Sequence, residues 1–279
     1  MKSYLKTSDY FLSKETYELL HDEELDMLIT HPKPIDVSKY YQSDNYISHT
    51  DQTFSIADKL YQGVKKVNLR NKLGLVEKVS HGEHTLLDVG AGTGDFLLFA
   101  KNHGWEVSGV EPNHQANQLA REKGLQLKLD LKDFSDHKFS AITLWHVLEH
   151  LPDLKENIKQ LYAMLEDDGT LIIAAPNFKS HDAKHYGKFW AGYDVPRHLW
   201  HFSKTAVQKM FSEYGLSLKG VRPMWFDSFY VSLLSEEYKT GKKNWGKALG
   251  LGLWSNAKGI FTREFSSHIY ILQKANRRP

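Results

Sequence analysis

Residues 85–96 read TLLDVGAGTGDF, a short apolar run followed at once by a turn with three glycines. The run Thr85–Val89 is typical of a buried strand, and the chain must reverse sharply where it ends. Glycine tolerates positive φ angles and lets the backbone approach a ligand closely, because it has no Cβ. Backbone N–H groups at the start of the next helix can then face that ligand. The stretch therefore predicts a ligand-binding turn between a strand and a helix.

The spacing of the turn narrows the class of ligand. Gly90, Gly92 and Gly94 follow a Gly-x-Gly-x-Gly pattern, and Asp95 stands where a dinucleotide-binding turn would have its third glycine. This disfavours a nicotinamide dinucleotide. Asp88, two residues before the first glycine, suits a ligand with an ammonium group, whereas it would repel a pyrophosphate.

A second acid, Glu111, stands about 20 residues beyond the turn, at the expected end of the next strand. A carboxylate at that place can accept hydrogen bonds from both hydroxyls of a ribose. Both nucleotide alternatives, a dinucleotide and a single nucleoside, predict this residue.

Outward from the turn, strand-like and helix-like segments alternate. The expected strands are residues 85–89, 106–110, 126–130, 141–144, 170–174, 216–221 and 268–273. The expected helices are residues 54–79, 95–102, 115–123, 154–165, 204–214 and 227–239. Strands separated by helices imply right-handed crossovers. The sequence therefore predicts an α/β fold of Rossmann-like, doubly wound type, with a mostly parallel seven-stranded sheet and helices on both faces.

Two parts of the chain depart from this alternation. Residues 1–53 have little periodicity, so we expect an N-terminal appendage to a main domain of residues 54–279. Within that domain, residues 176–202 form an insertion without regular structure, crowded with His, Trp, Tyr and Lys, and such insertions are usually functional. Residues 223–266 form a C-terminal cap, in which the glycine-rich segment 246–259 is expected to be mobile.

Composition excludes several classes of function. The chain has 36 Lys and Arg against 34 Asp and Glu, so no broad basic field favours a nucleic acid partner. It has no cysteine, which excludes disulfides, thiolate zinc sites, iron–sulfur clusters and a cysteine nucleophile. No signal-peptide core and no apolar run of bilayer length occurs, so we expect a cytoplasmic protein without a membrane span.

Three motifs carry a family resemblance. Residues 87–94 (LDVGAGTG), 110–113 (VEPN) and 144–151 (LWHVLEHL) resemble class I S-adenosylmethionine-dependent methyltransferases, in a bacterial branch similar to the ubiquinone-pathway O-methyltransferases. The resemblance implies S-adenosylmethionine as cofactor and S-adenosylhomocysteine as product. The donor-binding residues that it implies are Asp88, Gly90, Ala91, Gly92, Gly94, Glu111, Pro112, Asp130, Leu131, Trp145, His146 and Tyr46.

Each of these residues has an expected place around the donor. The glycine turn with Asp88 would surround the methionyl part, and Glu111 would bind the ribose. Asp130 with Leu131 would bind the adenine, although Asp133 could supply the same contact. Trp145 and His146 would line the floor of the site, and Tyr46 would close over the donor.

The similarity extends to residues 40–49 and 190–202, and so covers nearly the whole chain. In many such relatives cysteine pairs of zinc-ribbon type precede the paired tyrosines. Here residues 17–30 offer His21, Asp22 and Asp26 but no thiolate. The N-terminal segment is therefore expected to be a degenerate form without zinc.

Methyl transfer from a sulfonium is an in-line displacement, so a hydroxyl acceptor needs a base to remove its proton. Histidine suits this role near neutral pH, and the candidates are His146, His150, His181, His185, His198 and His201. We expect His198 to contact the acceptor first, then Arg197, whose guanidinium can bind a carboxylate or phosphate, and then His150. The alternative is that the histidines cap backbone groups while aromatic residues hold the insertion to the sheet.

Residues 146–150 also match the His-x-x-Glu-His pattern of inverted zinc proteases, which needs a long helix. Pro152 leaves room for about one helical turn, which argues against a protease. Some related ubiquinone-pathway enzymes place Glu, Glu and His at the positions of His146, Glu149 and His150 for a divalent metal. Because His replaces the first acid here, no metal is expected.

The sequence thus predicts transfer of a methyl group to a small-molecule acceptor, by O-methylation, in a monomer or homodimer. The alternatives are a nicotinamide-dependent oxidoreductase and a protein that binds the methyl donor without catalysis. A shift of the melting temperature by NADH or by S-adenosylmethionine would distinguish the first alternative.

Overall fold

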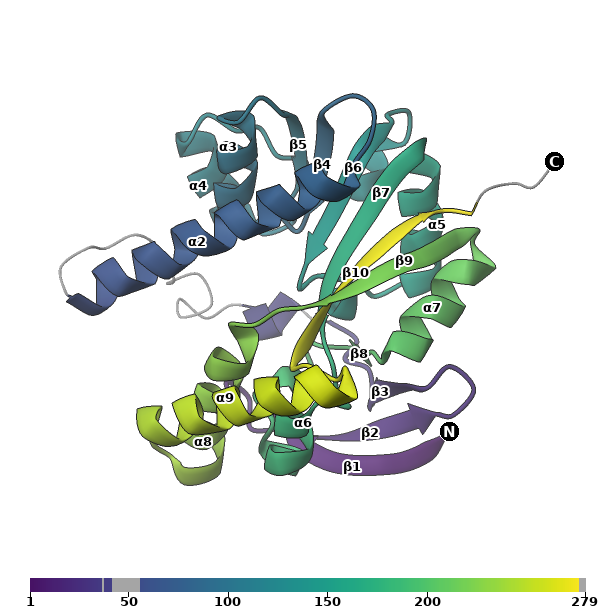
Figure 1. Ribbon diagram of the computed structural model, residues 1–279. Coiled ribbons are helices and arrows are strands. Elements are labelled where there is room, and N and C mark those ends of the chain that lie inside the picture. The colour runs from purple at the N-terminus through teal and green to yellow at the C-terminus, as the bar shows by residue number, and fades with distance from the viewer. Residues whose placement is uncertain (37, 42–55, 276–279) are drawn as a thin grey trace. The chain divides into compact units, whose positions relative to one another are not determined.

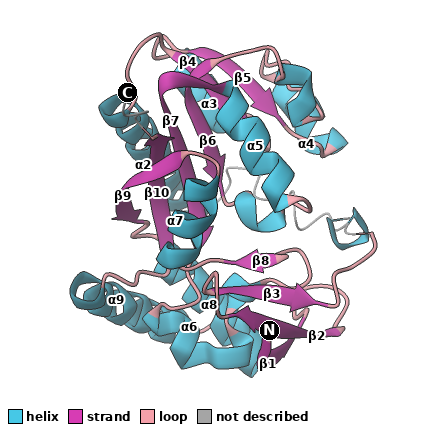
Figure 2. Ribbon diagram, turned by 90° about the vertical axis from the view of Figure 1, so that its right-hand side faces the viewer, coloured by secondary structure: helices cyan, strands magenta, loops and turns pink. Residues whose placement is uncertain are grey.

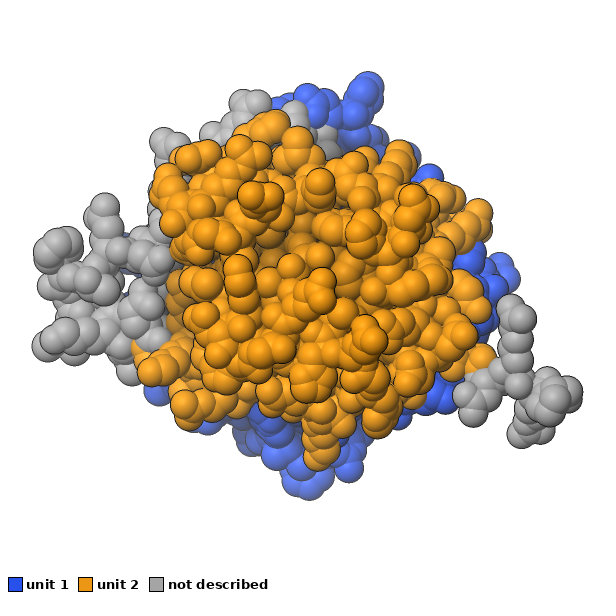
Figure 3. All heavy atoms as spheres, turned by 90° about the horizontal axis from the view of Figure 1, so that it is seen from above, with its two compact units in different colours: residues 1–42, 145–154, 173–270 blue, residues 43–144, 155–172, 271–279 orange. Residues whose placement is uncertain are grey.

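The computed structural model describes residues 1–36, 38–41 and 56–275. The chain divides into two compact units, coloured separately in Figure 3. The first unit comprises Met1–Gln42, Trp145–Leu154 and Ile173–Tyr270, and the second comprises Ser43–Leu144, Lys155–Ile172 and Ile271–Pro279. Because residues far apart in the sequence share a unit, this division differs from the expected boundary between residues 53 and 54.

The main sheet has six strands among the described residues, in the order β5-β4-β6-β7-β10-β9 (Figure 1). The strands are β4 (Thr85–Val89), β5 (Glu106–Val110), β6 (Phe139–Trp145), β7 (Leu165–Pro176), β9 (Leu216–Pro223) and β10 (Ser267–Lys274). β4 pairs in parallel with both β5 and β6, so that Leu87 lies opposite Ser108 and Ile142. The Rossmann-like α/β class is confirmed, with a mixed and mostly parallel sheet.

The expected count of seven strands was wrong, because residues 126–130 do not form a regular strand. Lys128 makes only an isolated parallel bridge with Val110, and its N–H donates to the carbonyl of Gly109. Leu125 and Leu127 are buried, whereas residues 128–130 are exposed. The alternation that suggested a strand thus reflects the burial of Leu125 and Leu127. Among the described residues, the backbone of the segment pairs with the sheet only at the bridge of Lys128.

Most expected helices are found within a few residues of their predicted bounds. They are α2 (Ile56–Val79), α3 (Asp95–Lys101), α4 (His114–Glu122), α5 (Leu154–Met164), α7 (Lys204–Glu213) and α8 (Asp227–Thr240). Side-chain caps fix two of the helix starts: Asn113 accepts from backbone N–H groups at the start of α4, and Ser203 does so at the start of α7. No helix of the described residues is long and apolar enough to cross a membrane.

The N-terminal residues form a second, antiparallel sheet in the order β1-β2-β3-β8 (Figure 2). Its strands are β1 (Lys2–Ser8), β2 (Thr16–Asp22), β3 (Met27–His31) and β8 (Trp200–His201). The last of these comes from the insertion, where Leu28 lies opposite His201. In place of the zinc ligands of a ribbon, Asp26 makes an ion pair with Lys179 and a hydrogen bond from Ser203.

The insertion 176–202 has regular structure, contrary to expectation. It contains the helix α6 (His181–Tyr186) and the short 3-10 helices η4 (Gly187–Phe189) and η5 (Ala191–Tyr193), followed by β8. Asp182 organises this segment, because its carboxylate accepts hydrogen bonds from Trp190, Ser255 and Ser266. The aromatic side chains of the insertion, Tyr186, Trp190 and Tyr193, are buried with Tyr17 and Leu28 in one apolar cluster.

The expected mobility of the glycine-rich segment 246–259 was also wrong, because it forms the long helix α9 (Trp245–Thr262). The glycines serve close packing there. A Cβ on Gly252 would lie 2.6 Å from the ring of Phe229, and a Cβ on Gly259 would lie 2.6 Å from that of Phe265. α9 packs beside α8 and against α6 (Figure 1).

The packing at Gly94 generates a stability prediction. Gly94 has φ 77°, and a Cβ there would lie 2.5 Å from Cδ1 of Leu125. Gly94→Ala should therefore lower the free energy of unfolding by about 2–4 kcal/mol, through backbone strain and overpacking together. Gly104 is a matched control, because its φ is 89° and a Cβ there would touch nothing. In urea denaturation Gly104→Ala should lower the free energy of unfolding only by the contribution of backbone strain. An equal decrease in the two variants would contradict the role assigned to Leu125.

Candidate functional site

The glycine turn reverses the chain between β4 and α3 through three residues with positive φ. The φ angles of Gly90, Gly92 and Gly94 are 70°, 54° and 77°. The N–H groups of Gly90 and Ala91 both donate to the carbonyl of Val110, at 2.8 and 2.9 Å, which ties the turn to the end of β5. The turn thus needs glycine for its backbone conformation.

The three glycines differ in what lies beyond their Cα atoms. A Cβ on Gly92 would meet no atom of the described residues within 4 Å, so the backbone is open to them on that side. Leu125 and Ala120 fill the corresponding space at Gly94. Gly92 can therefore leave room for a ligand, whereas Gly94 is required by packing.

Glu111 lies at the end of β5 with its carboxylate turned toward the glycine turn. Its Oε2 accepts a hydrogen bond of 2.8 Å from the N–H of Gly92, and its Oε1 accepts one of 2.8 Å from the N–H of Asn113. Burial raises the pKa of Glu111 above its ordinary value, against the effect of these two bonds. Each oxygen has a second lone pair, so the carboxylate can also accept from two hydroxyl groups of a ligand.

Asp88 lies within the sheet. It is 3% exposed, and its Oδ1 accepts a hydrogen bond of 2.6 Å from Thr143, its register partner on β6. Burial raises the pKa of Asp88 to about 7, with the charge of Lys72 acting in the opposite direction. The described contact of Asp88 is thus a buried bond between strands, and its contact with a ligand ammonium group stays a prediction.

The residues expected around the adenine are Asp130 and Leu131, and Pro112 is a further expected donor-binding residue, directly after Glu111. Pro112 is exposed, and Leu131 is buried at the start of the 3-10 helix η2 (Leu131–Phe134). Asp130 is exposed and caps η2, where it accepts a hydrogen bond of 2.9 Å from the N–H of Lys132. Tyr46 lies outside the described residues. These positions leave Asp130 accessible, but one of its oxygens already serves the cap.

His146 follows directly on Trp145, the last residue of β6, and has a positive φ of 59°. Its ring lies between two acids, with Nε2 2.9 Å from Oδ2 of Asp227 and Nδ1 3.4 Å from Oε1 of Glu149. Burial lowers the pKa of His146, but the charge of Asp227 and the contact with Glu149 outweigh it and raise the pKa to about 10. His146 is therefore an imidazolium at neutral pH and cannot act as a base there.

Glu149 and His150 lie in a single short turn, the 3-10 helix η3 (Leu148–His150). The segment thus forms about one turn, as expected, whereas an inverted zinc protease aligns its zinc ligands on a long helix. Glu149 is 1% exposed, and burial acts to raise the pKa of its carboxyl group. The contact with His146 and the charges of the surrounding histidines outweigh burial and hold that pKa at about 2. A permanent negative charge is thus buried among histidines.

His198, from the insertion, joins Glu149 and His150. Ligand atoms of these three side chains lie within 4.8 Å of one another, and the two imidazole rings are 4.6 Å apart in an edge-on arrangement. Nδ1 of His198 donates to the carbonyl of Gly192 at 3.0 Å, and Nδ1 of His150 donates to that of Arg197 at 3.1 Å. In the neutral rings Nε2 is then the nitrogen with a lone pair. The set can take up a proton or ligate a divalent metal.

Arg197 does not have the expected role of contacting substrate. It is 1% exposed, and its guanidinium is engaged by two carboxylates, with Nη2 2.9 Å from Asp9 Oδ1 and 2.6 Å from Asp194 Oδ1. Nε donates to the other oxygen of Asp194 at 2.9 Å. These contacts hold the N-terminal segment to the insertion, so the structure assigns Arg197 a structural role.

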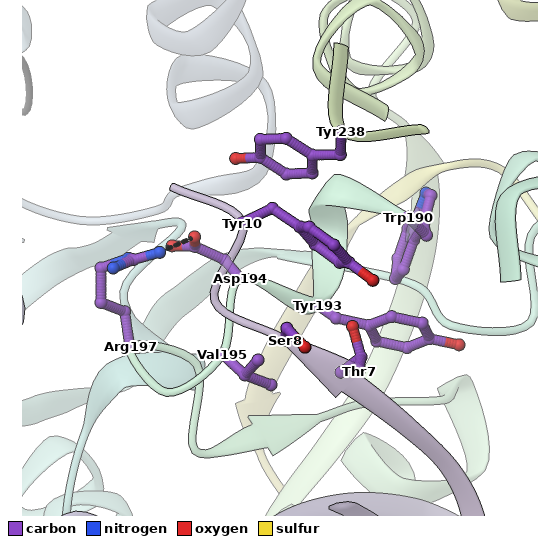
Figure 4. A pocket seen from close by; sticks show the side chains of 9 residues that line it. All are labelled: Thr7, Ser8, Tyr10, Trp190, Tyr193, Asp194, Val195, Arg197 and Tyr238. Atoms are coloured by element: carbon purple, nitrogen blue, oxygen red, sulfur yellow. Dashed lines mark hydrogen bonds and ion pairs between the residues drawn. The ribbon is translucent and has the colours of Figure 1, made fainter. Parts of the chain in front are cut away.

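Arg197, Asp9 and Asp194 form an ion triad, and a small pocket in the first unit is lined by two of its members, Asp194 and Arg197 (Figure 4). Figure 4 shows Arg197 and Asp194 joined at one side and the rings of Tyr10 and Tyr238 facing each other, with a ring separation of 5.4 Å. The remaining lining side chains are Thr7, Ser8, Trp190, Tyr193 and Val195. Among the expected donor-binding residues that the structure describes, none lines this pocket.

Sequence reasoning missed three partners of the site residues. Thr143 could have been found, because it carries a hydroxyl between the apolar residues Ile142 and Leu144, on a strand whose pairing with β4 sets it opposite Asp88. Asp9 and Asp227 carry no local signal, since they reach Arg197 and His146 only through contacts between distant parts of the chain.

Comparisons of the sequence with known proteins find methyltransferases, as the glycine turn and its acids predict. Residues 58–219 match the family model described as methyltransferase domain. The chain is 26% identical over 202 residues to an uncharacterized methyltransferase of Bacillus subtilis, which covers 64% of this chain and 78% of the relative. It is 30% identical over 131 residues to a ubiquinone biosynthesis O-methyltransferase of Actinobacillus pleuropneumoniae, covering 40% of this chain and 56% of the relative.

The fold also agrees with a solved structure, that of an S-adenosylmethionine-dependent methyltransferase from Archaeoglobus fulgidus. The TM-score is 0.52 at 19% identity, and the match covers 76% of this chain and 94% of that one. The family match, together with the open turn at Gly92 and the carboxylate of Glu111 facing it, favours a methyltransferase over a nicotinamide-dependent oxidoreductase. The chain belongs to the methyltransferase domain family, and S-adenosylmethionine is its methyl donor.

Proposed function

We propose that this protein transfers the methyl group of S-adenosylmethionine to a hydroxyl group of a small-molecule acceptor, with His198 as the general base. The observation that carries the proposal is the arrangement of His198 beside the buried carboxylate of Glu149. The similarity to a ubiquinone biosynthesis O-methyltransferase supports a hydroxyl as the acceptor.

The donor is assigned to residues at and around the glycine turn. The ribose hydroxyls bind the carboxylate of Glu111, and the methionyl part runs over the open side of Gly92, along the backbone of Gly90 and Ala91. Asp130, Leu131 and Pro112 bind the adenine, and Trp145 contributes to the floor. Asp88 supports the turn through its bond to Thr143, which keeps β4 and β6 in register. These roles rest on the openness at Gly92 and the direction of Glu111.

The choice of His198 as base rests on its place beside Glu149 and on the protonation of its two neighbours, His146 and His150. His146 is already protonated at neutral pH because of Asp227 and Glu149. Burial lowers the pKa of His150 to about 4, so His150 binds a proton only weakly. His198 has its Nδ1 fixed by Gly192, and Glu149 beside it stabilises the imidazolium that forms when Nε2 takes a proton.

The chemical step needs few participants. The acceptor oxygen attacks the methyl carbon as the bond from that carbon to sulfur breaks, and the hydroxyl proton passes to Nε2 of His198. The products are the methyl ether of the acceptor and S-adenosylhomocysteine. This chain's residues align the reactants and hold the proton, which is the main demand of an in-line displacement.

Loss of the carboxylate at Glu111 tests the donor assignment. Glu111→Ala should weaken binding of S-adenosylhomocysteine by about 1–3 kcal/mol, the usual value of a hydrogen bond to a charged group. Isothermal titration calorimetry measures this change. Glu106→Ala removes an exposed acid from the other end of β5 and should leave the affinity unchanged. Equal affinity of wild type and Glu111→Ala would refute the assignment.

Replacement of His198 tests the catalytic assignment. His198→Ala should keep donor affinity and lower the rate of S-adenosylhomocysteine formation by about 10²–10⁴-fold, the range for loss of a general base. His185→Ala, an exposed histidine of the same insertion, should change neither quantity.

Three measurements on the wild type and the His198 variant distinguish a base from a structural residue, a metal ligand and a protein without catalysis. A parallel loss of donor affinity and turnover would mean that His198 is structural. Loss of activity on treatment with EDTA, restored by a divalent metal, would mean that Glu149, His150 and His198 hold a metal in place of acting on a proton. Failure to form S-adenosylhomocysteine with any hydroxyl acceptor would favour a protein that binds the donor without catalysis.

The charge on His146 gives a pH prediction. The folded-state pKa of about 10 exceeds the ordinary value of 6.5, so the proton stabilises the folded protein. This stabilisation is fully present below about pH 6.5 and is lost as the pH rises through about 10. The difference in free energy of unfolding between wild type and Asp227→Asn should therefore shrink over that range. A difference that stays constant would show that His146 is neutral at pH 7.

A further inference from the structure

The helix α9 exposes a continuous apolar face. Six large side chains of this helix are exposed: Trp245, Leu249, Leu253, Trp254, Ile260 and Phe261. Trp245 is 71% exposed and Phe261 is 85% exposed, values that are unusual for large aromatic residues. Single exposed apolar residues are common, but a set of this size on one element marks an interaction surface.

The exposure follows from how α9 packs. Its small residues, Ala248, Gly252, Ser255 and Gly259, are buried, which lets the helix approach the rings of Phe229 and Phe265 closely. At about 100° per residue, Trp245, Leu249, Leu253 and Ile260 fall within an arc of about 80° that borders the buried side, where Asn256 is buried as well. The small residues of α9 therefore pack against the rest of the protein, whereas its large apolar residues are exposed to solvent.

The start of α8 extends this apolar surface. Phe226 and Tyr230 are both about half exposed, and α8 lies beside α9. In Figure 1 the two helices lie side by side, α8 in green and α9 in yellow. The surface is thus built by a helical hairpin and not by one helix alone.

The charged residues of α9 and of the turn before it are all basic, and one of them, Lys243, pairs with Glu237 of α8 at 3.8 Å. Residues 241–263 contain no Asp or Glu, and they include the basic residues Lys242, Lys243, Lys247, Lys258 and Arg263. Lys247 and Lys258 come next to Trp254 and Phe261 around the helix circumference. The ammonium group of Lys258 lies 5.0 Å from the ring centre of Trp254. Apolar and aromatic side chains bordered by lysines are typical of helices that lie in the interface of a bilayer.

We propose that the α8–α9 hairpin binds the surface of an anionic lipid bilayer, with α9 parallel to the surface and its apolar face in the headgroup region. Charge complementarity selects this occupant. A second copy of the chain would bring two sets of lysines together, whereas anionic headgroups supply the opposite charge. The inference is independent of the acceptor and of the roles assigned to His198 and Glu111.

Vesicle sedimentation with the full chain tests the proposal. We expect the protein to sediment with vesicles of phosphatidylcholine mixed with phosphatidylglycerol, and much less with vesicles of phosphatidylcholine alone. Lys242→Ala with Lys247→Ala should weaken the association by on the order of tenfold, because each basic side chain near an anionic surface strengthens binding. Leu249→Ser with Leu253→Ser should weaken it at least as much by removing inserted apolar area.

Matched controls distinguish a loss of vesicle binding from a loss of folding. Leu249 and Leu253 are 56% and 57% exposed, so their replacement should leave the melting temperature unchanged. Ile35→Ser with Val67→Ser removes two exposed aliphatic side chains elsewhere and should leave vesicle binding intact. No binding to the mixed vesicles, or equal binding by the leucine variant, would overturn the proposal. So would a dimer that the leucine variant dissociates, as measured by sedimentation velocity, without any association with vesicles.

Discussion

The conformation of the glycine turn is the constraint on which the rest of the second unit depends. Three residues with positive φ, Gly90, Gly92 and Gly94, must follow β4 in close succession for the chain to enter α3. Two N–H groups of the turn share the carbonyl of Val110, and a third binds the carboxylate of Glu111. The end of β5 is thereby held against the end of β4. The same bonds that close the turn aim an acid at its open side, so local folding and ligand recognition use one set of contacts.

The parts of the fold that could be predicted are those whose cause lies within a few residues. Apolar runs predicted the strands β4, β5 and β6, and Gly90 to Gly94 predicted the turn, because strand burial and positive φ are local demands. The direction of Glu111 also followed from its place at a strand end. Helix α9 could not be predicted in this way: its glycines suggested mobility, but Phe229 and Phe265, brought there by the fold, require them for close packing. The role of Arg197 depended equally on distant residues, since Asp9 lies 188 positions earlier in the chain.

The candidate catalytic residues form an alternating series of charges within the first unit. Asp227 and Glu149 flank the imidazolium of His146, and Glu149 in turn lies beside the imidazoles of His150 and His198. A buried carboxylate would be strongly destabilising alone, and here a protonated histidine on one side offsets that cost. The sequence pattern indicated that histidines gather after β6 and in the insertion. It could not say which one is charged, because that depends on Asp227, a residue of α8.

The ion triad of Arg197, Asp9 and Asp194 has a practical consequence for protein engineering. The first residues of the chain look dispensable, since Met1 and Tyr4 are exposed and β1 is an edge strand. A shortened chain that begins after Asp9 would nevertheless leave a guanidinium at a 1% exposed position with half of its partners missing. Removal of one partner of a buried ion pair commonly costs about 3–5 kcal/mol, a large share of the stability of a typical domain. A purification tag should therefore be added before Met1, and it should not replace β1 and the residues up to Asp9.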